Sequence, residues 1–177
     1  MRNLRTEDQI IINWKKDLNK PVVSICCATY NHEPYIEKTL EGFLIQETDF
    51  PFEILIYDDA STDKTAKIIS EYEAKYPKLI KPIYQTENKL SKGMKPSTFN
   101  FSRANGAYVA ICDGDDFWFS ADKLQVQIEL MKRYPDINIS FHSSYLSDAH
   151  NNIIKNKLIN NNGNEIKIIS PEEVILG

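Results

Sequence analysis

Short runs of apolar residues alternate along this chain with longer segments in which apolar residues recur every three or four positions. The short runs are typical of strands buried on both faces of a parallel sheet, and the longer segments of amphipathic helices packed on it. The sequence therefore predicts an α/β fold: a Rossmann-like, mostly parallel sheet flanked by helices. Strands are expected at residues 22–28, 52–57, 79–84, 108–112 and 137–141, with 108–112 as the central strand.

Residues at the ends of the segments support this pattern. Pro82 indicates that the strand at 79–84 lies at an edge, because proline cannot donate a ladder hydrogen bond. A helix is expected at 96–105, with Gly106 as its C-terminal stop. Other helix starts are predicted from a capping box at Thr6 and Gln9, from Pro34, from the caps Ser61, Thr62 and Asp63, and from Ser120.

Three regions are expected along the chain. Residues 1–20 form an N-terminal helical extension, and residues 21–146 form the core. Residues 147–177 form a loop or frayed hairpin rich in Asn and Lys, a possible strand at 166–169 and the start of a truncated C-terminal part. That last expectation rests on Ser170, which begins a helix start signal only a few residues before Gly177.

Composition narrows the class of protein. The 177 residues carry a formal net charge of −4 and are 42% hydrophobic, which suits one soluble globular domain without a basic face for nucleic acid. No apolar run is long enough to span a membrane and no signal peptide is visible, so a cytoplasmic protein is expected. The three cysteines lie in apolar runs, where buried reduced thiols are expected.

The most informative stretch is 109–118, in which a run of β-formers ends in Asp113, Asp115 and Asp116. Three carboxylates within four positions repel one another unless a positive charge lies among them. Carboxylate oxygens are the ligands of Mg²⁺ and Mn²⁺, and Mg²⁺ is usually held by one or two carboxylates together with substrate phosphates. A solvated acidic turn is the alternative interpretation of this stretch.

Two other predicted strands also end in polar residues, one at 29–31 and one at Asp58 and Asp59. Ligands of doubly wound sheets bind beyond the carboxyl ends of the strands, and parallel order brings these ends to one edge. The convergence favours a site for a phosphorylated ligand and a divalent metal over a solvated turn.

Three motifs in this order carry a resemblance: Val-Ser-Ile-Cys-Cys-Ala-Thr-Tyr-Asn at 23–31, Ile-Tyr-Asp-Asp-Ala-Ser-Thr-Asp at 56–63 and Cys-Asp-Gly-Asp-Asp-Phe-Trp at 112–118. Together they resemble family 2 glycosyltransferases with the GT-A fold, over about residues 21–146. The resemblance implies metal-dependent, inverting transfer of a sugar from a nucleotide diphosphate donor, commonly a UDP-sugar, with Mn²⁺ or Mg²⁺ as cofactor. It further implies a glycan or lipid-linked acceptor, bacterial surface polysaccharide synthesis and a place at the inner face of the cell membrane.

The resemblance also assigns roles by position. Thr29 and Tyr30 line the nucleoside pocket, and Asp59 accepts a hydrogen bond from the base. Asp113 contacts the ribose or donor, and Asp115 is the main metal ligand, with Asp116 as the alternative ligand. Lys92, Lys95 and Arg103 remain alternatives for meeting the diphosphate, and Asp58 and Asp63 have helix capping as an alternative role. The expected donor-binding residues are Thr29, Tyr30, Asn31, Glu33, Asp58, Asp59 and Asp113.

Three other functions share parts of this pattern. A nucleotidyltransferase typically carries a Gly-rich loop after its first strand, and residues 28–34 contain no glycine. A phospho-receiver domain places its Asp pair after the first strand, which here ends in Thr29. A catalytically incomplete nucleotide-sugar-binding module remains open: no general base is assigned before Gly177, so this chain is expected to bind nucleotide but to transfer sugar poorly.

Overall fold

The structure is a computed structural model of the chain and describes residues 4–15, 17, 20–148 and 152–159. The chain divides into two compact units, Met1–Arg133 and Tyr134–Gly177, which are described separately below. In the part of the chain that the structure describes, no helix has the length and apolar character needed to cross a membrane.

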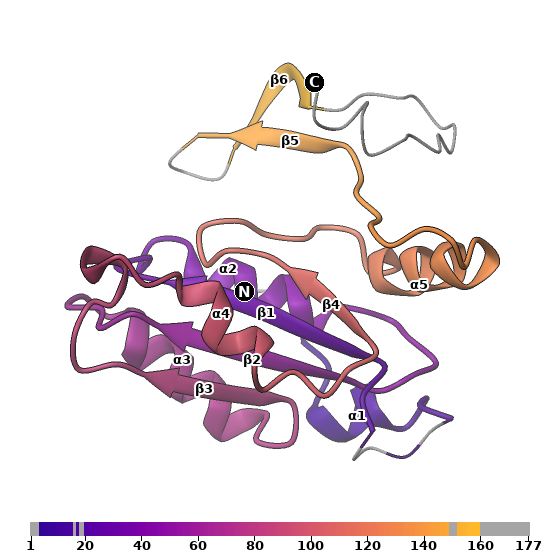
Figure 1. Cartoon of the computed structure of the whole chain (residues 1–177), viewed down its shortest axis with the longest axis horizontal. Helices are drawn as coiled ribbons and strands as arrows, with labels where there is room; N and C mark the ends of the chain where they lie inside the picture. Colours follow the sequence, from indigo (N-terminus) through magenta and orange to yellow (C-terminus); the bar gives the residue numbers. More distant parts are fainter. Residues whose placement is uncertain (1–3, 16, 18–19, 149–151, 160–177) are drawn as a thin grey trace. The chain divides into compact units, whose positions relative to one another are not determined.

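The first unit is built on a four-stranded sheet in the order β3-β2-β1-β4 (Figure 1). Every neighbouring pair in it is parallel. The predicted α/β class with a parallel sheet is therefore confirmed. β3, which contains Pro82, lies at an edge of the sheet that the described residues form, as expected. The strands are β1 (Val23–Thr29), β2 (Phe52–Asp58), β3 (Ile80–Tyr84) and β4 (Tyr108–Ile111).

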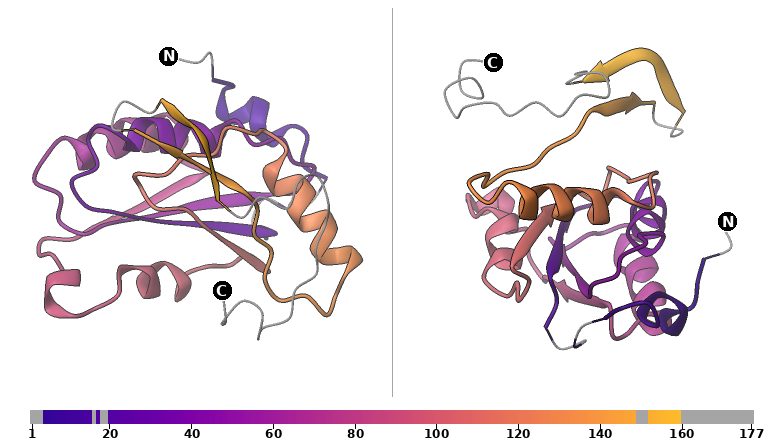
Figure 2. Two further views of the ribbon diagram at one scale, coloured as in Figure 1. Left: turned by 90° about the horizontal axis from the view of Figure 1, so that it is seen from above. Right: turned by 90° about the vertical axis from the view of Figure 1, so that its right-hand side faces the viewer.

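Helices cover both faces of this sheet. Figure 2 shows α2 and α3 on one face and α4 on the other. The capping box predicted at Thr6 is present, and α1 packs on the unit through the buried side chain of Ile10. The helices are α1 (Glu7–Ile11), α2 (Ile36–Leu44), α3 (Thr65–Lys75), α4 (Pro96–Phe101) and α5 (Lys123–Arg133), with a short 3₁₀ turn η1 (Leu90–Lys92) before α4.

The apolar core lies between the sheet and the helices α2 and α3, which pack on one of its faces. Side chains alternate between the two faces along each strand, so Ile25 of β1 and Ile54 of β2, which are register partners, share this core. Both are fully buried, as are Leu40 and Phe43 of α2 and Ile69 of α3. Burying this apolar surface is the main favourable contribution to folding.

Two predictions, one about β4 and one about the helix before it, are wrong. β4 is not central, because it ends the sheet within the described residues, and its outward side chains Val109 and Ile111 are 44% and 62% exposed. The helix predicted at 96–105 ends at Phe101, so Gly106 is not its stop. A Cβ on Gly106 would lie 2.5 Å from the backbone nitrogen of Ser24, so glycine is needed there because the chain passes close to β1.

The second unit also departs from the prediction. Its described residues contain no strand at 137–141, where Ile139 is 74% exposed. A short strand gains stability only when it pairs, and this segment has no paired neighbour in the described residues of its unit. The unit does contain an antiparallel hairpin of β5 (Ser144–Ser147) and β6 (Ile153–Ile159), which agrees with the hairpin alternative of the loop or frayed hairpin expected there. The strand predicted at 166–169 and the helix start at 170–173 lie outside the described residues.

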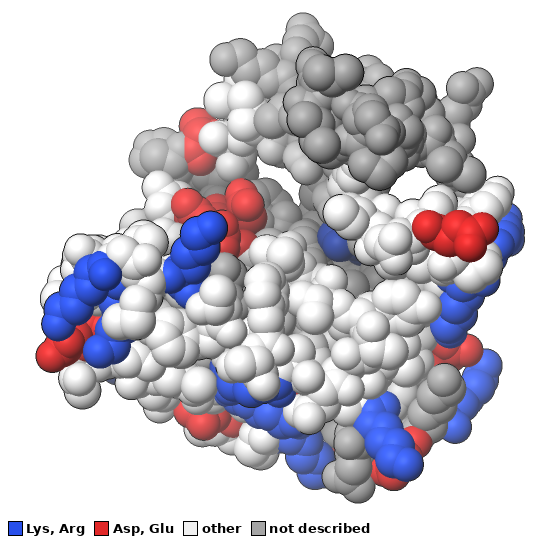
Figure 3. Space-filling view, viewed as in Figure 1, with Lys and Arg blue, Asp and Glu red and all other residues white. Residues whose placement is uncertain are grey.

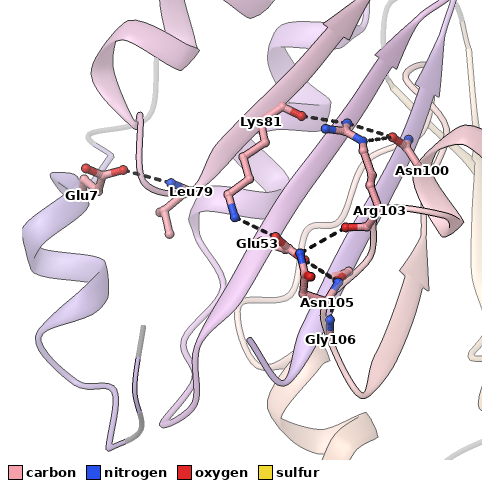
Figure 4. Close-up of polar contacts among 9 residues, drawn as sticks. Glu7, Glu53, Leu79, Lys81, Asn100, Arg103, Asn105 and Gly106 are labelled. Carbon is pink, nitrogen blue, oxygen red and sulfur yellow. Dashed lines mark hydrogen bonds and ion pairs between the residues drawn. The ribbon is translucent and has the colours of Figure 1, made fainter. Parts of the chain in front are cut away.

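A buried carboxylate organises the face of the sheet opposite the apolar core (Figure 4). Glu53 of β2 is 2% exposed, and its oxygens accept hydrogen bonds from Ser24 Oγ at 2.7 Å and the Asn105 backbone nitrogen at 2.9 Å. Lys81 Nζ of β3 lies 2.7 Å from the other carboxylate oxygen. Burial raises the pKa of Glu53, but the bonds from Lys81, Asn105 and Ser24 outweigh burial and hold that pKa below its ordinary value.

Arg103 extends the same network. Its guanidinium donates to the carbonyl oxygens of Ile56 in β2 at 2.9 Å and Lys81 in β3 at 2.8 Å. It also donates to the side chain of Asn100, whose amide in turn donates to Cys27 O of β1 at 2.9 Å. These bonds fix α4 and the turn before β4 on the sheet, as Figure 4 shows for the labelled residues.

We expect Glu53→Gln to lower the free energy of unfolding at pH 7 by about 2 kcal/mol. The change removes the charge of a buried carboxylate, which pairs with the half-exposed Lys81 and accepts charge-assisted hydrogen bonds. The folded pKa of Glu53 is depressed, so its contribution is present above about pH 4.3, the ordinary value, and is lost as pH falls through the folded pKa. Urea unfolding should therefore show the difference from wild type shrinking below that pH. Glu71→Gln, which breaks an exposed pair with Lys67, is the control and should cost at most about 0.5 kcal/mol. A pH-independent difference for Glu53→Gln would contradict the argument.

Candidate functional site at the carboxyl ends of the strands

The carboxyl end of β1 joins two of the predicted loops by backbone hydrogen bonds. The carbonyl oxygen of Thr29 accepts from the Asp59 nitrogen at 2.9 Å, and that of Ala28 accepts from the Gly114 nitrogen at 2.9 Å. The predicted convergence of the three strand ends at one edge of the sheet is therefore present in the structure.

The acidic residues lie in a tight turn after β4, in which the Asp116 nitrogen donates to Asp113 O at 3.1 Å. All three carboxylates are exposed at the surface, yet the turn partly desolvates two of them. This partial burial, followed by repulsion from Asp115, raises the pKa of both Asp113 and Asp116. His32 lies beside the turn, with Nε2 3.9 Å from Asp115 Oδ2.

The donor set suits a hard divalent cation, and the crowding that raises these pKa values is what such a cation would relieve. Among the described residues, however, no group of three or more His, Cys, Asp or Glu side chains is arranged around one metal position. Within the part of the chain that the structure describes, the turn therefore offers one or two carboxylate ligands to such a cation and no complete protein site. Mg²⁺ sites that include substrate phosphates and waters have this character.

Thr29 and Tyr30, expected in the nucleoside pocket, differ in exposure. Thr29 is 3% exposed, and its hydroxyl has no hydrogen-bond partner within the described residues. Tyr30 is 41% exposed and lies at the surface of the same loop. A buried hydroxyl without a partner is uncommon, so Thr29 has donor and acceptor capacity that a ligand could use.

Asn31 and Glu33 connect the β1–α2 loop to the β2–α3 loop. Asn31, at a φ of 55°, accepts from the Thr62 nitrogen at 2.7 Å, and its own nitrogen donates to Ser61 Oγ at 2.9 Å. Glu33 pairs with Lys64 Nζ at 2.7 Å, and this bond holds the pKa of Glu33 below its ordinary value. Both side chains therefore hold the β1–α2 loop against the β2–α3 loop.

Asp58 and Asp63 bond to different parts of the segment between β2 and α3. Asp58 is 2% exposed and accepts from the nitrogen and hydroxyl of Ser61, while burial raises its pKa. Asp63 accepts from the Thr65 nitrogen at 2.9 Å, at the start of α3, and from the Glu33 nitrogen at 3.0 Å. Asp63 thus satisfies a backbone nitrogen in the first turn of α3, which supports its capping alternative. Asp58 bonds only within the loop before the helix, whose N-cap residue is Lys64, so its bonds do not cap α3.

Asp59, the expected base contact, is 1% exposed. Its two oxygens accept hydrogen bonds from the backbone nitrogens of Lys89 at 2.7 Å and Leu90 at 3.0 Å. An ionised carboxylate has about four acceptor positions, so these bonds do not exhaust Asp59. They do fix the loop between β3 and α4 beside the expected base position.

The three candidates for the diphosphate contact occupy different surroundings. Arg103 is committed to the network on the sheet, and Lys92 pairs with Glu87. Lys95 is exposed and directly precedes α4. On the face shown in Figure 3, Lys and Arg side chains lie among Asp and Glu side chains and form no continuous basic surface.

Sequence reasoning missed a group of residues on α2 and just after it: Thr39, Gly42 and Gln46. Gln46 donates to Ser120 O at 2.7 Å and accepts from the Leu124 nitrogen at 3.1 Å. A Cβ on Gly42 would lie 2.7 Å from Trp118 O. The sequence held one indication of their role: they are three and four residues apart, which places a small residue and two polar residues on the buried face of the helix.

Residues 24–171 match the family model of glycosyl transferase family 2. That match covers most of the chain, so the protein belongs to this family. The resemblance drawn from the three motifs is thereby confirmed.

Relatives of this chain are longer proteins. An uncharacterized protein of Mycobacterium tuberculosis is 44% identical over 121 residues, which are 68% of this chain and 34% of that protein. TuaG of Bacillus subtilis, named as a glycosyltransferase of teichuronic acid biosynthesis, is 40% identical over 67% of this chain and 43% of its own length. This chain thus spans less than half the length of these relatives.

Solved structures agree with the fold. S. aureus TarS, residues 1–349 in complex with UDP, superposes with a TM-score of 0.55 at 30% identity, over 64% of this chain and 32% of TarS. The mannosyltransferase PcManGT of Pyrobaculum calidifontis, in complex with GDP-Man and Mn²⁺, gives 0.55 at 27% identity, over 67% of this chain and 34% of its own. The fold is therefore the GT-A fold expected from the sequence.

The raised pKa of Asp116 gives a prediction about stability without metal. An acid whose folded pKa is raised destabilises the fold where it is ionised, above its unfolded value of about 3.9, and not below it. Asp116→Asn in EDTA at pH 7 should therefore raise the free energy of unfolding, by no more than about 0.5 kcal/mol because the group is exposed. The gain should vanish near pH 4 in urea unfolding. Lower stability of the variant at pH 7 would contradict repulsion within the turn.

Proposed function

We propose that this chain is the nucleotide-sugar-binding part of a glycosyltransferase that transfers a sugar, from a UDP-sugar donor, to an acceptor hydroxyl during surface polysaccharide synthesis. The observation that carries the proposal is the backbone junction at the end of β1, which holds the Asp59 loop and the acidic turn together. UDP in the TarS complex and the name of TuaG support the donor and the pathway.

In this proposal each residue has a role in binding the donor. Thr29 and Tyr30 contact the nucleoside, Asp59 accepts a hydrogen bond from the base, and Asp113 contacts the ribose or donor. Asn31, Glu33 and Asp58 form and hold the walls of the donor site through the loop contacts described above. Lys95 is favoured for the diphosphate among the three basic candidates, because it is exposed and the other two are engaged.

Asp115, with Asp116 as the alternative, holds the divalent cation, Mn²⁺ or Mg²⁺. When bound, the cation acts as a Lewis acid that neutralises charge on the departing nucleotide diphosphate. PcManGT, in complex with Mn²⁺, supports this choice of metal. The remaining requirement for inversion at the sugar is a general base beside the acceptor hydroxyl, and none is assigned in this chain.

The acceptor is proposed to be a glycan or a lipid-linked sugar, reached on the cytoplasmic side at the inner face of the membrane. This chain spans 34% and 43% of two of its relatives, so activity and acceptor choice belong to the whole protein in this proposal. The residues assigned above to the donor, by contrast, all lie in the described part of the chain. The proposal is therefore tested first by ligand binding.

We expect UDP to stabilise the protein more in Mn²⁺ than in EDTA. A ligand that binds only the native state raises the free energy of unfolding by about 2.7 kcal/mol at about one hundred times its Kd. Thermal shift measurements with UDP, GDP and UMP, each in Mn²⁺ and in EDTA, should show the largest metal-dependent rise with UDP. A larger rise in melting temperature with GDP would mean that the donor carries guanine instead of uracil. No metal-dependent rise with either diphosphate would refute the proposal.

A pair of variants tests the placement of the metal. Asp115→Asn should weaken UDP binding in Mn²⁺ by about tenfold or more, because it removes a charged ligand from the cation. Asp63→Asn is the matched control: it makes the same chemical change to a residue that caps α3, and asparagine can still cap a helix. Isothermal titration of both variants should separate them. Equal losses would mean that the metal does not lie at Asp115.

A further inference from the structure

The acidic turn rests against the middle of α2 through one side chain. Thr39 is fully buried, and its Oγ1 lies 2.6 Å from the carbonyl oxygen of Asp116 and 3.0 Å from that of Gly114. These two residues flank Asp115. A single hydroxyl on a helix therefore meets the peptide groups on both sides of the carboxylate assigned to the metal.

Core packing alone does not account for a threonine at this position. Neighbouring buried positions of α2 carry Ile36, Leu40 and Phe43, and valine has the shape of threonine without its polar atom. A threonine in a helix can satisfy its hydroxyl on the carbonyl four residues earlier, but the Tyr35 oxygen lies at 3.3 Å, farther than either oxygen of the turn. The shortest bond goes to the acidic turn.

The rest of the turn is restrained from β1. The Gly114 nitrogen donates to Ala28 O at 2.9 Å. A Cβ on Gly114 would lie 2.5 Å from Thr29 Oγ1 and 2.9 Å from His32 Nδ1, so the chain passes closely between these side chains. β1 thus fixes the first part of the turn, and Thr39 is the contact that reaches past Asp115 to the Asp116 carbonyl.

We propose that Thr39 is a positioning residue that holds the backbone on both sides of Asp115, so that the Asp115 carboxylate is directed at the cation before the nucleotide diphosphate binds. The hydroxyl donates its proton to the Asp116 carbonyl, and Gly114 O is the second acceptor within reach. Thr39 itself touches neither metal nor nucleotide. This inference rests on the proposed function, because it assigns the cation to Asp115.

The test separates metal-dependent from metal-independent binding. The UDP dissociation constant is measured by isothermal titration in Mn²⁺ and in EDTA for wild type, Thr39→Val and Thr39→Ser. Thr65→Val is the matched control, because Thr65 is an equally buried threonine in α3. We expect Thr39→Val to weaken binding about tenfold in Mn²⁺, as for residues that orient metal ligands, and to leave it unchanged in EDTA.

Thr39→Ser keeps the hydroxyl and should restore binding in Mn²⁺ to within about twofold of wild type, while Thr65→Val should match wild type in both conditions. If Thr39→Val does not fold, Thr39→Ala removes the same hydroxyl and takes its place. Equal losses in Mn²⁺ and EDTA, no loss, or failure of serine to restore binding would overturn the role of Thr39 while leaving the proposed function intact. Wild type without any Mn²⁺ dependence would overturn the proposed function, and this inference with it.

Discussion

The structure depends on the position of β1 between two parallel partners. Its register with β2 runs from Val23 opposite Phe52 to Thr29 opposite Asp58, and on its other side it pairs with β4. Because all three strands run in the same direction, their carboxyl ends lie together. The last carbonyl groups of β1 then accept hydrogen bonds from the loops after both neighbours, so an error in this pairing would separate the Asp59 loop from the acidic turn.

The two faces of the sheet hold these loops by different physical means. One face is an apolar core against α2 and α3, where burial is non-directional and sets how closely the layers approach. The other carries Glu53 and Arg103, whose hydrogen bonds have defined donors and acceptors and fix the turn before β4. These hydrogen bonds fix the point at which the chain enters β4. Because β4 is short and leads directly into the acidic turn, they also help to position that turn.

The carboxylates of the acidic turn oppose one another's ionisation. Asp113 and Asp116 have raised pKa values because partial burial and neighbouring charges oppose their ionisation. A fold can retain such a turn when the surrounding structure restrains it strongly, and functional sites commonly carry this cost. Here the restraint comes from β1 on one part of the turn and from α2 on another.

The sequence by itself determined the fold class, the strand-end positions of Thr29, Asp58 and Asp113, and the family, because periodicity and motif spacing are local properties of the chain. Only the tertiary structure decided that β4 ends the sheet formed by the described residues and that Gly106 serves a close approach to β1. It further decided that 137–141 forms no strand in the described part of its unit. It also decided the partners of Asn31, Asp59 and Thr39. Each of these depends on segments far apart in sequence, and a polar side chain that could bond to many groups acquires its partner only when the folded chain brings one within hydrogen-bond distance.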